Sequence, residues 1–177
     1  MSLLDSWSMF GFQKLSSLFI AAGLVLGLQA PAANAVAPTG EAVTVAAALA
    51  AGSTSIEFSP QLVAQLGYRP TSGAGLPENP TGSCSSPVAL PASFEPACRV
   101  HDLGYDLLRV AHRNGEYIPQ EIRRDLDSQL ERQMGRTCQS EGCRFMASAA
   151  HVAVGLNSAR QGYGAPVEEK WLAWLPW

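Results

Sequence analysis

The spacing of hydrophobic residues predicts two long helices in the second half of the chain. In residues 97–113 the apolar positions fall on one helical face, at Leu103, Leu107, Val110 and Ala111. In residues 119–137 an apolar residue recurs at every fourth position, at Ile122, Leu126, Leu130 and Met134. The short connection around Asn114 and Gly115 predicts that the two helices form an antiparallel hairpin.

Weaker patterns extend the all-α prediction to the rest of the chain. Residues 144–160 form a third helix, with its large apolar residues at Phe145, Met146, Val152, Val154 and Leu156. A serine cap at Ser59, a first-turn proline and a terminal Gly67 predict a short helix over residues 61–66. The Ala-rich residues 36–52 form either a short helix or a spacer. Residues 69–96 are rich in Gly, Pro, Ser and Asn and predict a long loop, and no strand is predicted.

The first 35 residues resemble a secretory signal peptide. A lysine at Lys14 precedes an apolar run over residues 15–28, and small residues close the run at Ala33 and Ala35. A bilayer span needs about 20 apolar residues, so we expect cleavage after Ala35 and a secreted protein. An uncleaved membrane anchor is the alternative. The mature chain then divides into an Ala-rich segment (36–70), a helical domain (71–160) and a Trp-rich tail (161–177).

Export makes the four cysteines informative, because an oxidising compartment favours disulfides. Three pairings are possible, and the one that closes the smallest loops joins Cys84 to Cys98 and Cys138 to Cys143. We favour that pairing. A zinc site is the alternative, but the spacing contains no CxxC motif.

The balance of charges excludes some partners. The net charge of −3 provides no basic patch for nucleic acid. It also provides no long-range attraction to anionic lipid, so any membrane contact would be apolar or zwitterionic.

The candidate chemistry centres on the adjacent pair His101 and Asp102. A helix turns by about 100° per residue, so Asp102 is badly placed to orient the His101 ring. Asp127 lies at the edge of the apolar stripe of the second helix and is the acid best placed to face His101, with Asp125 as the alternative. An imidazole held by a carboxylate at one ring nitrogen can accept a proton from water at the other, which predicts general-base hydrolysis.

Asp102 needs a separate role. A bond between Cys98 and Cys84 would hold the Gly- and Ser-rich loop beside the Asp102 carboxylate. Carboxylate and backbone carbonyl oxygens suit calcium better than zinc, and a cation there would stabilise an oxyanion.

These residues resemble a known family. Phe94, Ala97-Cys98, His101-Asp102 and Gly104-Tyr105 resemble the active-site helix of secreted phospholipases A2, particularly the small bacterial and fungal branch. The likeness continues through Asp127-Ser128, Met134 and Cys138, and Cys84 falls where that branch has a cysteine. It covers about residues 84–143, with a looser likeness in the third helix.

The resemblance implies calcium-dependent hydrolysis of the sn-2 acyl ester of glycerophospholipids at a membrane or micelle interface, by a monomer. His101 would be the base, Asp127 its orienting partner and Tyr105 a supporting hydroxyl. Asp102 would bind calcium together with the backbone at Gly82 and Ser83. The bacterial branch has a second calcium-binding aspartate where this chain has Gly82. Backbone carbonyls of the loop could still bind the ion, as they do in the animal branch, and Glu78 or Asn79 is a further candidate to compensate.

Two other functions stay open. A catalytically silent module of the same fold would bind lipid or a surface partner, and a third possibility is an extracellular metal-binding enzyme with another substrate. The remaining polar residues have simpler interpretations. We interpret His112 and His151 as structural, and we expect a solvated charged face at Asp106, Arg109 and Arg113. The tail over residues 171–177 is either an interfacial anchor or a cover for the core or a partner.

Overall fold

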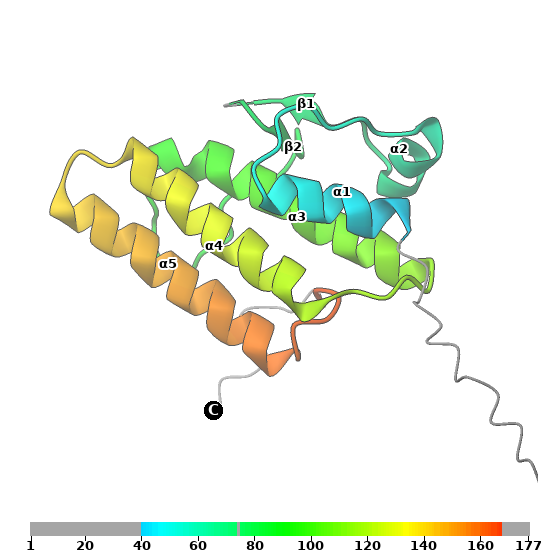
Figure 1. Ribbon diagram of the computed structural model, residues 1–177. Coiled ribbons are helices and arrows are strands. Elements are labelled where there is room, and N and C mark those ends of the chain that lie inside the picture. Colours follow the sequence, from blue (N-terminus) through cyan, green and yellow to red (C-terminus); the bar gives the residue numbers. More distant parts are fainter. Residues whose placement is uncertain (1–39, 74, 168–177) are drawn as a thin grey trace, which may run out of the picture. The chain divides into compact units, whose positions relative to one another are not determined.

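Three long helices form the framework of the protein. The computed structural model describes residues 40–73 and 75–167. Within them, α3 (Glu95–Arg113) and α4 (Gln120–Thr137) lie side by side with opposite directions, and α5 (Glu141–Arg160) packs along α4 (Figure 1). The predicted hairpin is therefore confirmed, and each of its helices begins and ends within two residues of the predicted bounds.

The Ala-rich segment contains a helix rather than a spacer. Helix α1 (Glu41–Ala50) packs against both α3 and α4. Its two ends are held by other elements, since Glu116 Oε2 accepts a hydrogen bond from the Val43 N–H at 3.0 Å and the Gln129 side-chain amide donates to the Leu49 carbonyl. These bonds satisfy helix-terminal groups that have no partner within the helix.

The expected short helix is also present. Helix α2 (Pro60–Leu66) begins after Ser59, whose hydroxyl accepts a hydrogen bond from the Leu62 N–H at 3.1 Å. It ends at Gly67, which has a φ of +80°, a conformation that glycine adopts at little cost.

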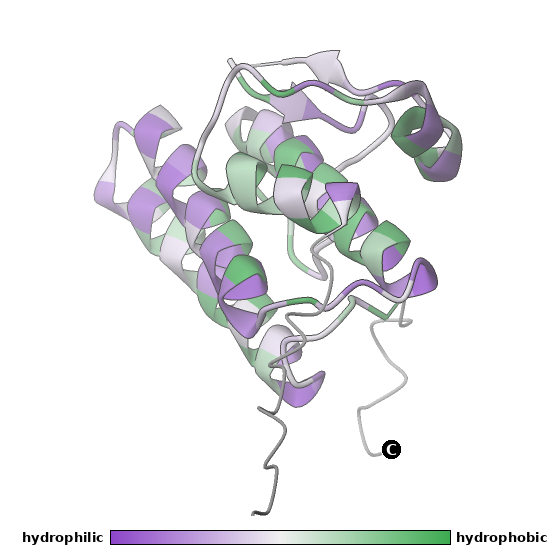
Figure 2. Ribbon diagram, turned by 45° about the vertical axis from the view of Figure 1, so that its right-hand side comes forward, coloured by the Kyte–Doolittle hydropathy of each residue, from purple (hydrophilic) through white to green (hydrophobic). Residues whose placement is uncertain are grey.

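The core lies between α1, α3 and α4, with a second cluster between α3, α4 and α5. The two predicted apolar stripes of the hairpin are buried, every member being at most 7% exposed. Hydrophobic and hydrophilic residues alternate along the long helices, as expected for amphipathic helices (Figure 2). Helix α5 differs, because Phe145, Val152 and Leu156 are 74%, 58% and 68% exposed.

The predicted disulfides are both present. Cys84 is bonded to Cys98 and Cys138 to Cys143, so these four cysteines do not form a zinc site. The expected loop before α3 contains two short strands that the sequence pattern did not predict. Strand β1 (Thr71–Ser72) pairs antiparallel with β2 (Pro77–Glu78), and a 3-10 turn, η1 (Ala92–Phe94), leads into α3.

Two sequence predictions concern residues outside those described here. They are the signal peptide over residues 1–35 and the Trp-rich end over residues 171–177. Among the described residues, no helix combines the length and hydrophobicity that a membrane span requires.

A close contact between Gly104 and Leu126 brings α3 and α4 together. A Cβ at Gly104 would lie 2.5 Å from Leu126 Cδ2, and the Leu126 side chain is fully buried. We expect Gly104→Ala to lower the free energy of unfolding by about 1–2 kcal/mol, because overpacking outweighs the gain in helix propensity. Denaturant titration followed by circular dichroism measures this change.

Leu126→Ala provides the matched background, because it removes the obstructing methyl groups. In that background Gly104→Ala should be neutral or should stabilise by up to about 1 kcal/mol. Additivity of the two substitutions within about 0.5 kcal/mol would show that this contact does not set the distance between the helices.

Candidate active site

The carboxylate of Asp127 is the centre of a buried hydrogen-bond network. Its Oδ1 lies 2.9 Å from His101 Nε2 and accepts a hydrogen bond from the Tyr105 hydroxyl at 2.7 Å. Its Oδ2 accepts a hydrogen bond from Ser158 Oγ at 2.6 Å. Asp127 is 1% exposed, so three side chains from two other helices take the place of water around it.

Helix geometry brings these groups together. His101 and Tyr105 are four residues apart on α3, so they share a face and their rings lie 4.1 Å apart between centroids. Asp127 faces them from α4, and Ser158 closes the network from the last turns of α5. Asp125 is exposed, so the structure places Asp127 and not Asp125 beside His101.

The surroundings favour the charged form of Asp127. Burial by itself raises the pKa of this carboxyl, but the hydrogen bond and charge of His101, with the hydrogen bonds from Ser158 and Tyr105, lower it below 3.8 overall. Burial raises the pKa of Tyr105 to about 12, so its hydroxyl remains a donor at neutral pH. Asp127 is therefore an anion that can hold the His101 ring in one orientation.

His101 has one ring nitrogen left for chemistry. Its Nε2 is engaged by Asp127, and its Nδ1 makes no hydrogen bond with any of the described residues. When Nε2 donates to the carboxylate, Nδ1 is the unprotonated acceptor of the neutral ring. This arrangement can accept a proton from a bound water.

Arg123 is a member of the site that sequence reasoning missed. It is fully buried, and its guanidinium carbon lies 4.8 Å from the centre of the Tyr105 ring. It donates to the Gly164 carbonyl at 2.9 Å and to Gln161 Oε1 at 3.0 Å, with a longer bond of 3.4 Å to the Tyr105 hydroxyl. It therefore fixes Tyr105 and anchors the chain that follows α5. Its position one turn before Asp127 was the only signal in the sequence.

Asp102 lies on another side of α3, against the loop that Cys84 ties to the helix. Its Oδ2 accepts a hydrogen bond from the Ser83 N–H at 2.9 Å. Burial raises the pKa of the Asp102 carboxyl, and the Ser83 N–H and the charge of His101 only partly oppose this effect. The charge of Asp102 is thus desolvated and incompletely compensated.

Gly82 is required by this close approach. A Cβ on Gly82 would lie 2.6 Å from Asp102 Oδ2, so no side chain fits there unless Asp102 or the loop moves. An aspartate at this position would also place a second carboxylate against the first. The aspartate that the bacterial branch has at this position would therefore require the Asp102 carboxylate or the loop to shift.

Neither residue named as compensating for Gly82 faces Asp102. Glu78 forms an ion pair with Arg99 at 3.0 Å. Asn79 accepts a hydrogen bond from the Thr81 N–H at 2.9 Å and donates to Asp106 Oδ2 at 3.0 Å. Both side chains stabilise the loop itself.

The oxygen atoms at and beside Asp102 are of the kind that a hard cation such as calcium prefers, but only one carboxylate is among the groups that carry them. Among the described residues, no group of three or more His, Cys, Asp and Glu side chains is arranged to hold a metal ion. Calcium takes about six to eight oxygen ligands, so backbone carbonyls of the loop and water would supply most of them. The uncompensated charge of Asp102 is the feature that a cation would neutralise.

The expected solvated face on α3 is wrong for two of its three residues. Asp106 and Arg109 are half-buried and bonded to each other at 2.7 Å, and Asp106 also accepts a hydrogen bond from the Tyr68 hydroxyl at 2.6 Å. Burial raises the pKa of Tyr68, which keeps its hydroxyl protonated. Arg113 is exposed, as expected, and donates to the Gln65 carbonyl.

The other two histidines lie outside the network. His112 is exposed at the end of α3. His151 Nδ1 lies 2.9 Å from Glu131 Oε2 and links α5 to α4, in agreement with a structural role.

The comparisons with known proteins provide no further identification. No family model matches this sequence, and searches of curated proteins and of solved structures also returned no match. We therefore base the functional assignment on the chemistry and geometry of the site.

The Asp127 network predicts a pH-dependent stability. Because the folded state lowers the pKa of Asp127 below 3.8, its contribution to stability is present above that pH and is lost as the pH falls through the folded-state pKa. We expect Asp127→Asn to lower the free energy of unfolding at pH 7 by about 3 kcal/mol, since three donors lose their charged acceptor. The difference from wild type should shrink in acid, as measured by urea unfolding at several pH values.

Asp102→Asn is the matched control with the opposite sign. A raised folded-state pKa means that the Asp102 charge opposes folding at neutral pH, and this cost disappears as the pH falls through the folded-state pKa. In chelator at pH 7, Asp102→Asn should be at least as stable as wild type. Equal losses of stability in both variants would contradict the distinct environments described for the two carboxylates.

Proposed function

We propose that this chain is a secreted phospholipase A2-like hydrolase that cleaves the sn-2 acyl ester of glycerophospholipids. The observation that carries the proposal is the buried His101–Asp127 pair with the Tyr105 hydroxyl on the same carboxylate. These are the residues to which the family resemblance assigns the reaction. Together they provide the general base and the carboxylate that orients it, as water-mediated ester hydrolysis requires.

Each of these residues has one role in the proposed hydrolysis. Asp127 fixes the ring of His101 through Nε2, and Nδ1 removes a proton from a water molecule as its oxygen attacks the ester carbonyl carbon. The protonated ring, stabilised by the Asp127 charge, then returns the proton to the glycerol oxygen as the bond between that oxygen and the acyl carbon breaks. Fatty acid and lysophospholipid are the products. Tyr105 and Ser158 keep the Asp127 carboxylate in place throughout.

Asp102 would hold a calcium ion together with backbone oxygens of the loop at Gly82 and Ser83. Such an ion supplies positive charge where the ester oxygen becomes negative. A single carboxylate favours weak binding, in the range of extracellular calcium modules, about 10⁻⁴–10⁻³ M.

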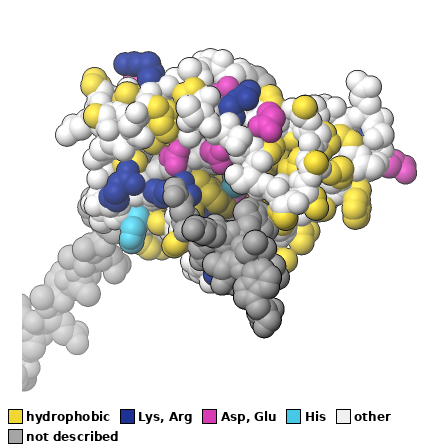
Figure 3. All heavy atoms as spheres, turned by 180° about the vertical axis from the view of Figure 1, so that it is seen from behind, with side chains coloured by type: hydrophobic (Ala, Val, Ile, Leu, Met, Phe, Trp, Pro, Cys, Tyr) yellow, Lys and Arg dark blue, Asp and Glu magenta, His cyan; other side chains and the backbone are white. Residues whose placement is uncertain are grey.

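The exposed apolar residues of α5 suit an enzyme that works at a lipid interface. Phe145, Val152 and Leu156 fall within about 40° of one another around the helix axis. In Figure 3, which views the molecule from the side opposite to Figure 1, acidic and basic side chains lie beside one another. The exposed apolar residues of α5 are the feature that agrees with apolar contact with zwitterionic lipid.

A catalytically silent lipid-binding module is the second candidate. It is favoured by one observation, the Ser83 N–H bound to Asp102 Oδ2 where a calcium enzyme needs that carboxylate for the metal. Such a module would keep the fold and the interface contact without turnover.

Fatty-acid release from an sn-2-labelled phosphatidylcholine tests the enzyme directly. We expect release by wild type at millimolar calcium, and a loss of about 10²–10⁴-fold in His101→Ala, since that variant lacks the general base. His112→Ala is the control, because it removes an exposed histidine from the same helix and should leave the rate unchanged.

Repeating this assay with and without calcium distinguishes the proposed hydrolase from the silent lipid-binding module. Release that stops in chelator and in Asp102→Asn supports the proposed role of Asp102. If wild type binds vesicles but releases no fatty acid at any calcium concentration, the hydrolase proposal is contradicted and the silent module is supported. Release that persists in chelator would contradict the calcium site while keeping the hydrolase.

A further inference from the structure

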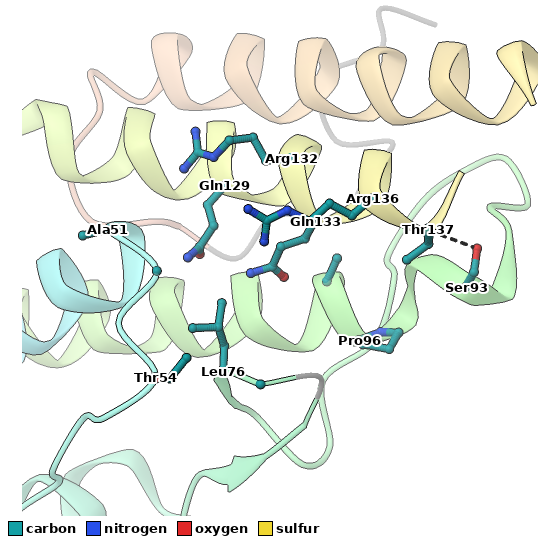
Figure 4. Close-up of a pocket in the computed structure, with 13 residues that line it drawn as sticks. Ala51, Thr54, Leu76, Ser93, Pro96, Gln129, Arg132, Gln133, Arg136 and Thr137 are labelled. Atoms are coloured by element: carbon teal, nitrogen blue, oxygen red, sulfur yellow. Dashed lines mark hydrogen bonds between the residues drawn. The ribbon is translucent and has the colours of Figure 1, made fainter. Parts of the chain in front are cut away.

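A cleft lies between the C-terminal half of α4 and the start of α3, with a volume of about 380 Å³ (Figure 4). Five polar side chains of α4 line it, namely Gln129, Arg132, Gln133, Arg136 and Thr137. None of the side chains around Asp127 lines it. Two residues along a helix turn by about 200°, so Gln129 points away from Asp127. This cleft is therefore separate from the candidate active site.

The cleft contains positive charge that none of the described residues pairs. No aspartate or glutamate is among its lining residues. Arg132 and Arg136 are exposed, and among the described residues neither has a hydrogen-bond or ion-pair partner for its guanidinium. They lie one turn apart on α4, where like charges repel each other. An anion bound between them would remove that repulsion.

A buried donor in the same wall points to an oxygen ligand. The amide nitrogen Nε2 of Gln133 is buried, and it has no hydrogen-bond partner in the described part of the chain. Gln129 differs, since its amide donates to the Leu49 carbonyl. Figure 4 shows both glutamine side chains pointing from α4 into the space beside Leu76. An unpaired buried donor is unfavourable, and an acceptor oxygen in the cleft would satisfy it.

The opposite wall limits the size and character of the ligand. Leu76, Pro96 and Ala97 provide apolar surface there. Ser93 and Thr137 close one end, with their hydroxyls 3.3 Å apart. A volume near the lower limit of small-molecule sites, about 300–1,000 Å³, suits an anionic head with a short apolar body.

We propose that this cleft binds a small oxyanion, a carboxylate or a phosphate, between Arg132 and Arg136, with Gln133 donating to one of its oxygens. Arginine is well suited to this role, because its planar guanidinium bonds carboxylate and phosphate oxygens in pairs. The site does not depend on the proposed hydrolase function, so either can fail without the other.

The test titrates the full-length chain with inorganic phosphate and, separately, with octanoate below its micelle concentration, each at constant ionic strength set with chloride. Side-chain amide signals in ¹H–¹⁵N spectra report binding at Gln133 in wild type and in the arginine variants, and backbone amide signals of α4 report binding in Gln133→Leu. We expect these signals to shift in a saturable way with at least one probe. The probe that binds identifies the head group as phosphate or carboxylate.

Three variants locate the site. Arg136→Gln and Gln133→Leu should each weaken binding by about tenfold, the loss expected for one charge-assisted or buried hydrogen bond to an anion. Gln133→Leu should also keep the fold, because it removes a buried donor that has no hydrogen-bond partner among the described residues. Arg144→Gln removes the same charge from an exposed position on α5 outside the cleft, and it should bind as wild type does.

Two results would overturn the proposal. One is the absence of a saturable shift at Gln133 with both probes. The other is an equal loss of binding in Arg144→Gln and Arg136→Gln, which would show a general response to net charge.

Discussion

The arrangement of the three long helices depends on the charge buried at Asp127. An ionised carboxyl removed from water is strongly unfavourable unless hydrogen bonds replace its hydration. Here the replacement donors come from α3, through His101 and Tyr105, and from α5, through Ser158. The network is satisfied only when all three helices have one relative position, so the same contacts that stabilise the fold also orient the proposed base.

The two neighbouring residues of α3 have different environments because each faces a different partner. His101 faces Asp127 on α4. Its Nε2 contacts the Asp127 carboxylate, and its Nδ1 stays available to accept a proton. Asp102 faces the loop tied down by the disulfide between Cys84 and Cys98, and there one backbone N–H is its only hydrogen-bond partner among the described residues. The Asp127 carboxylate contacts three side-chain donors, whereas Asp102 accepts one backbone hydrogen bond. This incomplete compensation of the Asp102 charge is the observation that supports the proposed calcium site.

Much of this arrangement followed from the periodicity of the sequence. The apolar stripes of the hairpin give the register of α3 and α4, and the register places Asp127 opposite His101. The sequential spacing of the cysteines gave both disulfides, since short loops close most readily. Gly82 stood out in the sequence only as a departure from the family pattern, and in the structure a Cβ there would lie 2.6 Å from Asp102 Oδ2, so a side chain would displace that carboxylate.

What the sequence could not give are the contacts made between distant segments by polar residues. Ser158 and Arg123 look like ordinary helix-surface residues until α5 and the chain after it fold back onto α4. Asp106 looked solvated because its partner Tyr68 lies in a loop 38 residues earlier. Periodicity also did not separate the large apolar residues of α5, of which Met146 and Val154 pack beside Ala147 in the second cluster while Phe145, Val152 and Leu156 are exposed.

The tautomer of His101 tests the central claim most directly, because the proposed chemistry requires a proton on Nε2 and none on Nδ1 in the resting protein. Long-range ¹H–¹⁵N spectra of the imidazole rings at neutral pH distinguish the two nitrogens. We expect the neutral ring of His101 to have its proton on Nε2, with a strongly downfield signal that disappears in Asp127→Asn. A proton on Nδ1, or a signal that is unchanged in Asp127→Asn, would contradict the pairing from which the site is built.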